Sequence, residues 1–309
     1  MIPQFWQAVG GKLAERWLPT TVTAAVFWLI GVGAWASVNG GFHELLTWVD
    51  ELIPAGQVAL LIGSLIVVGG SVLVVNRITE PVFRLVEGYW PLWLLWLWER
   101  VGRRRRARKA DKLNAAWQEL HNRLSANGPP LTAVEYAHYL RLDARRLAEP
   151  PGEHRRMPTR VGAMLRAAES RPRDRYGLEF TTVWPRLWLV LPDTTRAQVG
   201  AARKAMLDST AVAVWGLLFT GFGLVNVWAL PTGLATAAVT LTLWLPARTQ
   251  VFADLVESVF DLHRSDLYRQ LRWPLPATPV EERASGELLS QFLRRGSDSG
   301  HPKFTTPHV

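Results

Sequence analysis

Three long apolar runs, at residues 17–42, 52–76 and 209–247, dominate the hydropathy pattern of the chain. About 20 apolar residues in a helix cross the roughly 30 Å hydrocarbon layer of a membrane. The first two runs therefore predict one membrane span each, near residues 20–38 and 58–75.

The third apolar run is long enough for two spans. Pro231-Thr232-Gly233 reads as a turn inside it, which predicts spans near 210–230 and 234–247. We therefore predict an all-α integral membrane protein with four transmembrane helices and a helical cytoplasmic domain.

The predicted organisation follows from these spans and from the polar stretches between them. It consists of an N-terminal amphipathic interfacial helix at 1–19, a transmembrane hairpin at 20–76, a cytoplasmic helical domain at 77–208, a second transmembrane hairpin at 209–247, cytoplasmic C-terminal helices at 248–295 and a disordered tail at 296–309.

The distribution of basic residues predicts the orientation. The 39–53 loop contains no Lys or Arg, whereas basic residues are frequent before the first span and after residue 76. Because cytoplasmic flanks carry an excess of Lys and Arg, both termini and the 77–208 segment should be cytoplasmic. Only five of the 35 basic residues are lysines, a bias typical of GC-rich bacterial genomes, so we expect a bacterial inner membrane. Ala34-Trp35-Ala36 resembles a signal-peptide cleavage site, and cleavage there would leave three spans.

A segment rich in Trp and Arg, residues 88–112, follows the second span. Its apolar part is too short to cross a bilayer and suits the membrane interface. The predicted interfacial anchors are Trp17, Trp90, Trp93, Trp96 and Trp98. The predicted contacts to anionic phospholipids are Arg103, Arg104, Arg105, Arg106, Arg108 and Lys109. The alternative is an ordinary positive flank; because the nearby membrane accounts for the charge, we expect no nucleic-acid partner.

The cytoplasmic segments contain several helix signals. Periodicity predicts helices at 104–126, 132–148 and 158–169 and a long helix at 194–230, while 176–191 reads as a short strand or a buried loop. Thr278-Pro279-Val280-Glu281 has the form of a capping box and predicts a helix to about Arg295.

Candidate chemistry is sparse. The chain has no Cys, and the predicted spans contain no ionisable residue, which argues against pumps and coupled transporters. Asp254, Glu257 and Asp261, with His263 nearby, could bind a divalent cation, pair with Arg residues or face solvent. We expect no catalytic residue, no metal and no cofactor, and we lean away from an enzyme.

If the chain has a cytoplasmic site, two clusters of polar and aromatic residues are the best candidates. Each cluster lies close in sequence to a helix that enters the membrane from the same side, so the two could meet. The candidate residues are Tyr176, Trp184, Arg186, Asp261, His263 and Arg264.

Glycines in the second and third spans, such as Gly69 and Gly216, permit close helix approach. Their packing can be intramolecular, or it can produce a homo-oligomer.

Several strings together resemble a group of uncharacterised multipass membrane proteins of high-GC Gram-positive bacteria. They are Gly11-Lys12-Leu13-Ala14-Glu15-Arg16-Trp17, Pro158-Thr159-Arg160-Val161-Gly162, Arg175-Tyr176-Gly177-Leu178 with Trp184-Pro185-Arg186-Leu187, and Phe260-Asp261-Leu262-His263-Arg264. The resemblance implies a membrane protein over most of residues 10–275 and implies no activity.

Three functions remain open. The first is a non-enzymatic membrane scaffold or sensor that binds a protein partner through its cytoplasmic domain. The alternatives are an oligomeric ion channel or pore-forming effector, and a membrane-bound enzyme acting on lipid.

Overall fold

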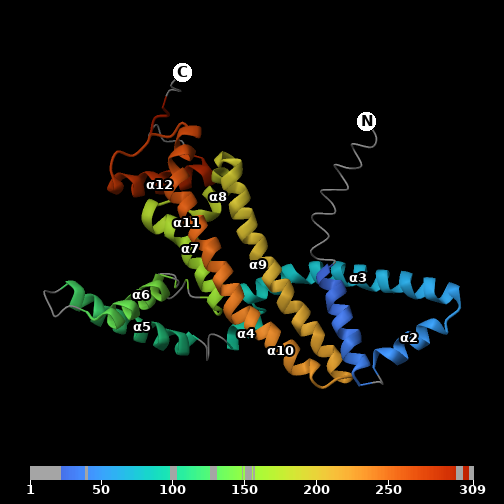
Figure 1. The fold of residues 1–309 in the computed structure, drawn as a ribbon. Helices are drawn as coiled ribbons and strands as arrows, with labels where there is room; N and C mark the ends of the chain where they lie inside the picture. Colours follow the sequence, from blue (N-terminus) through green and yellow to red (C-terminus); the bar gives the residue numbers. More distant parts are fainter. Residues whose placement is uncertain are drawn as a thin grey trace, which may run out of the picture. The chain divides into compact units, whose positions relative to one another are not determined.

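The structure, a computed structural model, describes residues 22–38, 41–97, 103–125, 131–147, 149, 155, 157–296 and 302–305. Every regular element within these ranges is helical, which confirms the all-helical prediction for them (Figure 1). The predicted helix at 1–19, Trp17 and Trp98 lie outside the described residues.

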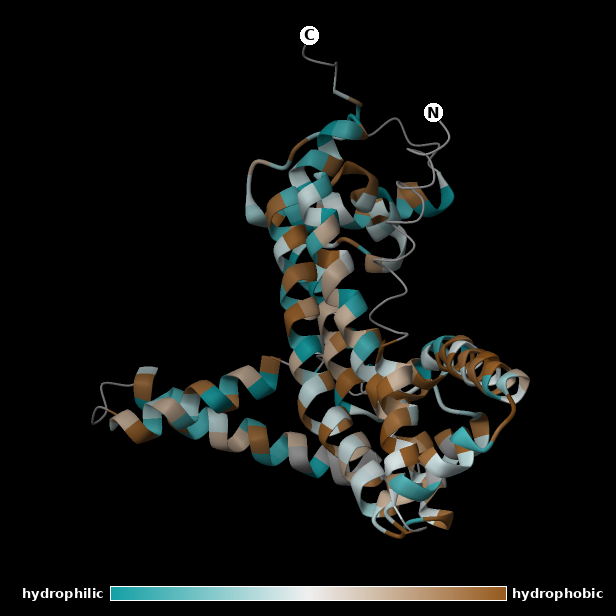
Figure 2. Ribbon diagram, turned by 45° about the vertical axis from the view of Figure 1, so that its right-hand side comes forward, coloured by the Kyte–Doolittle hydropathy of each residue, from teal (hydrophilic) through white to brown (hydrophobic). Residues whose placement is uncertain are grey.

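The chain divides into two units. One contains Met1–Phe83 and Leu207–Leu245, and we call it the apolar unit. The other contains Arg84–Met206 and Pro246–Val309, and we call it the polar unit. Figure 2 shows that hydrophobic residues dominate helices of the apolar unit, whereas hydrophilic residues are frequent along those of the polar unit.

The described part of the apolar unit begins with a helix at Val22–Ala36. The chain then leaves this unit after Phe83 and returns to it at Leu207. The other described elements of the unit are α2 (Phe42–Asp50), most of α3 (Pro54–Glu87), the end of α9 (Asp193–Phe219), the 3-10 helix η3 (Thr220–Leu224), α10 (Ala229–Val239) and the π-helix η4 (Thr240–Trp244). Its core contains Ala24, Val72, Val75, Val214 and Trp215.

Three described helices are long and apolar enough to cross a membrane, not the four predicted from the sequence. They are Pro54–Glu87, Asp193–Leu224 and Ala229–Gln270, of 34, 32 and 42 residues. The helix at Val22–Ala36 is shorter. At 1.5 Å per residue it reaches about 22 Å, less than the roughly 30 Å of a hydrocarbon layer.

The turn of the second hairpin lies earlier than predicted. Residues 225–228 form it, with the Asn226 side-chain oxygen accepting from the Trp228 N–H at 3.0 Å. Pro231 instead occupies the first turn of α10, where its missing N–H has no helical partner to lose. The prediction of one helix over 194–230 was wrong for this reason: an Asx turn, rather than Pro-Thr-Gly, reverses the chain.

Gly233 is needed for packing rather than for a turn. A Cβ there would lie 3.0 Å from the Thr220 backbone nitrogen, and one on Gly216 would lie 3.0 Å from the Ala237 nitrogen. These contacts bring the two arms of the hairpin together within one chain. By contrast, a Cβ on Gly63, Gly69 or Gly70 of α3 would meet nothing within 4 Å among the described residues.

The polar unit contains the remaining helices. They are α4 (Leu92–Leu97), α5 (Arg103–Ser125), α6 (Ala133–Leu147), α7 (Arg160–Tyr176), α8 (Phe180–Val190), the first part of α9, α11 (Leu245–Gln270) and α12 (Pro279–Arg295). Its core is formed by α8, α9, α11 and α12 with the Trp273 segment, and includes Leu187, Val199, Phe260, Trp273 and Leu289.

Residues 176–191 are not extended, contrary to the prediction. They hold the end of α7 and all of α8. The apolar residues of α8 follow a helical period, so Phe180 stacks on Trp184 at 5.2 Å between ring centroids and Val183 and Leu187 are buried. Pro185 lies inside this helix, and the packed apolar face outweighs the hydrogen bond that Pro cannot make.

The C-terminal helix α12 begins where the capping box predicts. The Thr278 side chain accepts from the Glu281 N–H, and the Glu281 carboxylate accepts from the Ala277 N–H at 3.2 Å. Beyond it, the sequence predicted a disordered tail at 296–309. Residues 302–305 instead lie against the polar unit, where Thr305 hydrogen-bonds to Arg272.

Candidate functional site

Helix α7, whose side chains contact α11, has a capping residue at each end. Thr159 caps its start by accepting from the Gly162 N–H at 3.0 Å. Gly177 ends it with a φ of 71°, a left-handed conformation that favours glycine. A Cβ at Gly177 would also collide with the Arg283 carbonyl of α12. Tyr176 and Gly177, which belong to one of the strings that carry the resemblance, are therefore a helix end that α12 contacts.

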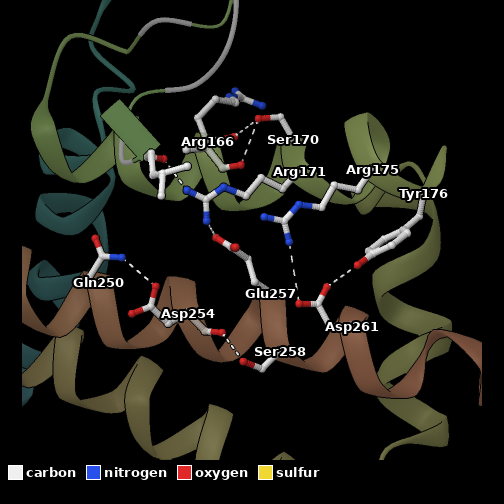
Figure 3. Close-up of polar contacts among 12 residues, drawn as sticks. Arg166, Ser170, Arg171, Arg175, Tyr176, Gln250, Asp254, Glu257, Ser258 and Asp261 are labelled. Carbon is white, nitrogen blue, oxygen red and sulfur yellow. Dashed lines mark hydrogen bonds and ion pairs between the residues drawn. The ribbon is translucent and has the colours of Figure 1, made fainter. Parts of the chain in front are cut away.

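Ion pairs join α7 to α11 (Figure 3), and we call the contact the polar interface; it comprises Arg171, Arg175, Tyr176, Glu257 and Asp261. Arg171 pairs with Glu257, and the two side chains are only 18% and 14% exposed. One turn further along both helices, Arg175 lies 3.8 Å from Asp261. The basic pair on α7 and the acidic pair on α11 share a spacing of four residues, so each helix presents its charges on one face.

Tyr176 adds a neutral contact to the same interface. Its hydroxyl donates to Asp261 Oδ1 at 2.6 Å. Burial, and then the hydrogen bond to Asp261 and the charge of that carboxylate, raises the pKa of the Tyr176 phenol above its ordinary value. The phenol is therefore held in its protonated, donating form.

Arg264 extends the polar interface to α12. Its guanidinium lies 4.2 Å from the centroid of the Tyr176 ring, and its Nε donates to Glu282 Oε1 at 2.6 Å. Three helices are thus tied at one place by a cation over an aromatic ring and by charge-assisted hydrogen bonds.

The acidic face of α11 had three possible uses, and pairing with arginines is the one seen for Glu257 and Asp261. Asp254 accepts from Gln250 at 2.7 Å. Within the described part of the chain, no group of three or more His, Cys, Asp or Glu is placed to hold a metal ion.

Of the six candidate residues, the structure brings Tyr176, Asp261 and Arg264 together. Trp184 is partly buried and packs against the core of the polar unit, with its ring centroid 5.9 Å from that of Phe260. Arg186 and His263 point elsewhere. Arg186 donates to the carbonyls of Thr182 and Leu293, at 2.6 and 3.3 Å, and His263 lies 3.1 Å from Asp266.

Arg171, Arg175 and Glu282 were not among the residues predicted from the sequence. The four-residue spacing of Arg171 and Arg175 matches that of Glu257 and Asp261, and this match was the available signal. It indicates which faces of the two helices are complementary.

A cavity of about 360 Å³ lies on the other side of α7. Its lining comes from α7, from the start of α8 and from the segment before α7; the charged members are Arg155, Arg166, Glu169, Arg173 and Glu179. Arg155 is held by Asp174 at 3.0 Å, and Arg166 reaches Glu169 at 3.4 Å. Burial raises the pKa of the Glu169 carboxyl, which Arg166 only partly offsets.

The predicted interfacial anchors are placed in part. Trp93 and Trp96 of α4 are 70% and 59% exposed, as an anchor in a membrane interface requires. Trp90 instead donates from its ring nitrogen to the Leu85 carbonyl at 2.8 Å. The predicted lipid contacts all lie in the first two turns of α5; the side chains of Arg103, Arg104, Arg105, Arg106 and Lys109 lie outside the described structure, and Arg108 is exposed.

Helices α5 and α6 pack on each other through stacked rings. His121 stacks on Trp117 with centroids 4.3 Å apart, and the Arg146 guanidinium lies 3.8 Å from the Trp117 ring centroid. Trp117 donates to Asp143 at 2.8 Å, and His121 lies within hydrogen-bond distance of the Tyr139 hydroxyl. These partners indicate a structural role for His121.

Comparison with known proteins adds no family to this picture. No family model, curated protein or solved structure matches the chain. Membership of the group that the sequence resembles therefore stays a prediction.

Proposed function

We propose that the chain is a non-enzymatic membrane scaffold or sensor of the bacterial inner membrane that binds a protein partner through its polar unit. In this proposal the protein has four spans, one of which contains the helix at Val22–Ala36, and the polar unit and both termini face the cytoplasm. The basic start of α5 binds anionic phospholipid headgroups.

The observation that carries the proposal is the course of the helix from Ala229 to Gln270. It is unbroken over 42 residues and begins in the apolar hairpin. Its later part supplies Val256, Val259 and Phe260 to the core of the polar unit. The same part carries Glu257 and Asp261 of the polar interface, so a displacement of this helix would act directly on the position of α7.

The lipid contact is supported by the charge at the start of α5. Four consecutive arginines open this helix and its first turn has no acidic residue. Cations are disfavoured at a helix N-terminus, because the helix dipole places partial positive charge there. Anionic headgroups would offset that repulsion, and the exposed Trp93 and Trp96, of a residue type that favours the membrane interface, precede the arginines in the chain.

Charge reversal in the polar interface tests the partner-binding role. Membranes with the tagged full-length chain are crosslinked and purified for the wild type, the E257R variant and the R171E/E257R variant. We expect a protein that co-purifies with the wild type, falls at least five-fold with E257R and returns with the double reversal. Equal recovery of that protein with the wild type and with both variants would count against a role for this unit in binding.

The ion-channel alternative retains one observation in its favour. Only 11% of the most apolar stretch of α3 is buried, and a Cβ on Gly63, Gly69 or Gly70 would meet nothing within 4 Å among the described residues. Such faces favour association between helices in a membrane. Ion flux from liposomes that contain the purified chain, abolished by Gly69→Leu, would replace the scaffold proposal with the channel.

A further inference from the structure

The short segment 302–305 pairs with the polar unit through its backbone. The Thr305 N–H donates to the Arg272 carbonyl at 2.8 Å, and the Thr305 hydroxyl donates to the same oxygen at 3.2 Å. In return, Arg272 Nε donates to the Thr305 carbonyl at 3.2 Å. Donors and acceptors are thus exchanged in both directions, as when an extended peptide is recognised through its main chain.

An aromatic side chain anchors the same segment. The Phe304 ring meets Trp273 and Phe292 edge-on, with centroids 6.4 and 5.9 Å away and interplanar angles of 70° and 65°. Trp273 is 4% exposed, whereas Phe304 remains 52% exposed. The receiving surface therefore belongs to the core, while the ring that rests on it is held from one side only.

Arg272 has a backbone conformation that is uncommon for its residue type. Its φ is 56°, and it is the non-glycine residue with a positive φ among those described. This geometry follows the end of α11, where the Trp273 N–H returns to the Tyr268 carbonyl at 2.9 Å. The Arg272 carbonyl accepts from the Thr305 N–H. The chain reversal therefore positions one of the two groups through which Arg272 contacts the segment.

We propose that Arg272, Trp273 and Phe292 form a docking surface for an extended peptide that contains Phe followed by a residue with free backbone groups, and that residues 302–305 of the same chain occupy it reversibly. Few contacts hold the segment, and half of its anchor ring faces outward. Five residues, 297–301, connect it to Gly296, so the tether presents it at an effective concentration on the order of mM. A weak site is then largely filled by its own tail, and a partner with a similar peptide must displace that tail.

The test uses the full-length chain and a fluorescent peptide of residues 297–309, followed by fluorescence anisotropy. The Phe304→Ala chain removes the anchor ring from the surface and leaves every residue of the buried core in place. We expect the wild-type peptide to bind the F304A chain at least ten-fold more tightly than the wild-type chain. A peptide with F304A should bind at least ten-fold more weakly, and a peptide with Lys303→Ala should bind within two-fold of the original.

Several results would overturn the proposal. They are no binding to either chain, equal binding to both chains, or a loss that follows Lys303→Ala instead of Phe304→Ala. A lower molecular mass for the F304A chain than for the wild type would show that the tail bridges two copies, which would overturn the assignment within one chain.

Discussion

The phenol of Tyr176, the last residue of α7, donates to the carboxylate of Asp261 on α11 at 2.6 Å, across 85 positions of sequence. The same carboxylate lies 3.8 Å from Arg175, and the guanidinium of Arg264 covers the Tyr176 ring. The hydroxyl of Tyr176 thus contacts Asp261, and the face of its ring contacts Arg264, about one turn later on α11.

Replacing Tyr176 with Phe distinguishes the contribution of the hydroxyl to stability from that of the ring. The variant keeps the ring under Arg264 and loses the hydrogen bond to Asp261, so we expect a loss of about 1 kcal/mol in the free energy of unfolding. Burial raises the pKa of Tyr176, so its contribution is present below the ordinary tyrosine value and is lost as pH rises through the raised value.

Thermal unfolding between pH 8 and 11 measures this dependence. The wild type should lose stability at the alkaline end more steeply than Y176F. Tyr268, whose pKa burial raises to about 12, is common to both proteins and cancels in the comparison. Tyr136→Phe, at an exposed position of α6, is the control and should follow the wild type. Parallel curves for wild type and Y176F would show that ionisation of the Tyr176 phenol does not change stability over this pH range.

The pair of Arg171 and Glu257 should contribute more, because both side chains are shielded from water. Glu257→Gln leaves the Arg171 guanidinium, whose pKa burial already lowers, without its charged partner. Removing one member of a buried pair costs about 3 kcal/mol. The matched control is Glu287→Gln on α12, where Arg283 and Glu287 are 3.7 Å apart and 61% and 55% exposed.

Denaturant unfolding in detergent compares the stability lost in E257Q with that lost in E287Q. E287Q should change the free energy of unfolding by less than about 0.5 kcal/mol, as is usual for exposed pairs. If E257Q were as mild as E287Q, the polar interface would not stabilise the docking of α7 on α11.

Side-chain direction explains why the sequence identified only part of this site. Successive helix residues are rotated by about 100°, so Arg264, three residues after Asp261, shares its face, whereas His263, two residues after it, points away. Tyr176 and Asp261 were paired because each lies near a helix that leaves the apolar unit. Arg171 and Arg175 lie beyond residue 169, where the predicted helix ended, whereas α7 continues to Tyr176, so their shared face was not predicted.

Local rules predicted some elements well and misled elsewhere. The start of α12 follows from four residues, since Thr278 and Glu281 satisfy the free N–H groups of a helix end. Pro231 misled the prediction, because it was placed in a turn. Pro185 and Pro231 both lie inside helices, where tertiary packing and first-turn geometry tolerate them. The docking of residues 302–305 depends on Trp273 and Phe292, which only the fold brings together.

The glycine crossing in the second hairpin should tolerate no added methyl group. In Gly233→Ala the new Cβ would press on the Thr220 backbone and on the Gly216 carbonyl, so the two arms must separate. We expect a loss of about 1–3 kcal/mol, typical of overpacking. Gly221→Ala, in the same hairpin, meets nothing within 4 Å and is the control.

Thermal unfolding in nanodiscs compares the two glycine variants. G233A should melt several degrees below G221A, which should match the wild type. An unchanged melting temperature for G233A would show that the arms pack less closely than the structure has them.

The pairing of Glu135 with Arg123 predicts an acid-sensitive contact between α5 and α6. The Arg123 hydrogen bond, at 2.8 Å, and the N–H and hydroxyl of Thr132 lower the pKa of Glu135 to about 2. Because the folded pKa is depressed, the contact is fully present above the ordinary value of 4.5 and is lost as pH falls toward 2.

Carbon-13 NMR of labelled glutamate carboxyls follows this titration directly, with Glu135→Gln to assign the signal. The Arg123→Met variant should move the midpoint of Glu135 upward toward its ordinary value. A wild-type midpoint near 4.5, or one that R123M leaves in place, would contradict the hydrogen-bonded geometry.

The number of spans is decided by single-cysteine labelling, since the natural chain contains no Cys to remove. The proposed positions are Lys12→Cys, Thr47→Cys, Ser125→Cys and Leu224→Cys. With four spans, a membrane-impermeant maleimide added to intact cells should label Thr47→Cys and Leu224→Cys at least ten-fold more than the other two. All four should label equally after permeabilisation.

The pair of positions 12 and 47 isolates the short helix at Val22–Ala36, because it is the described helix between them. If that helix does not cross the membrane, both positions lie on one side and label alike, and three spans remain. Position 125 then tests orientation separately: it follows the arginine-rich start of α5, and labelling from outside would invert the orientation that the basic residues predict. Loss of position 12 from the purified protein would instead identify cleavage near Ala34-Trp35-Ala36, so each arrangement of the first apolar segment gives its own pattern.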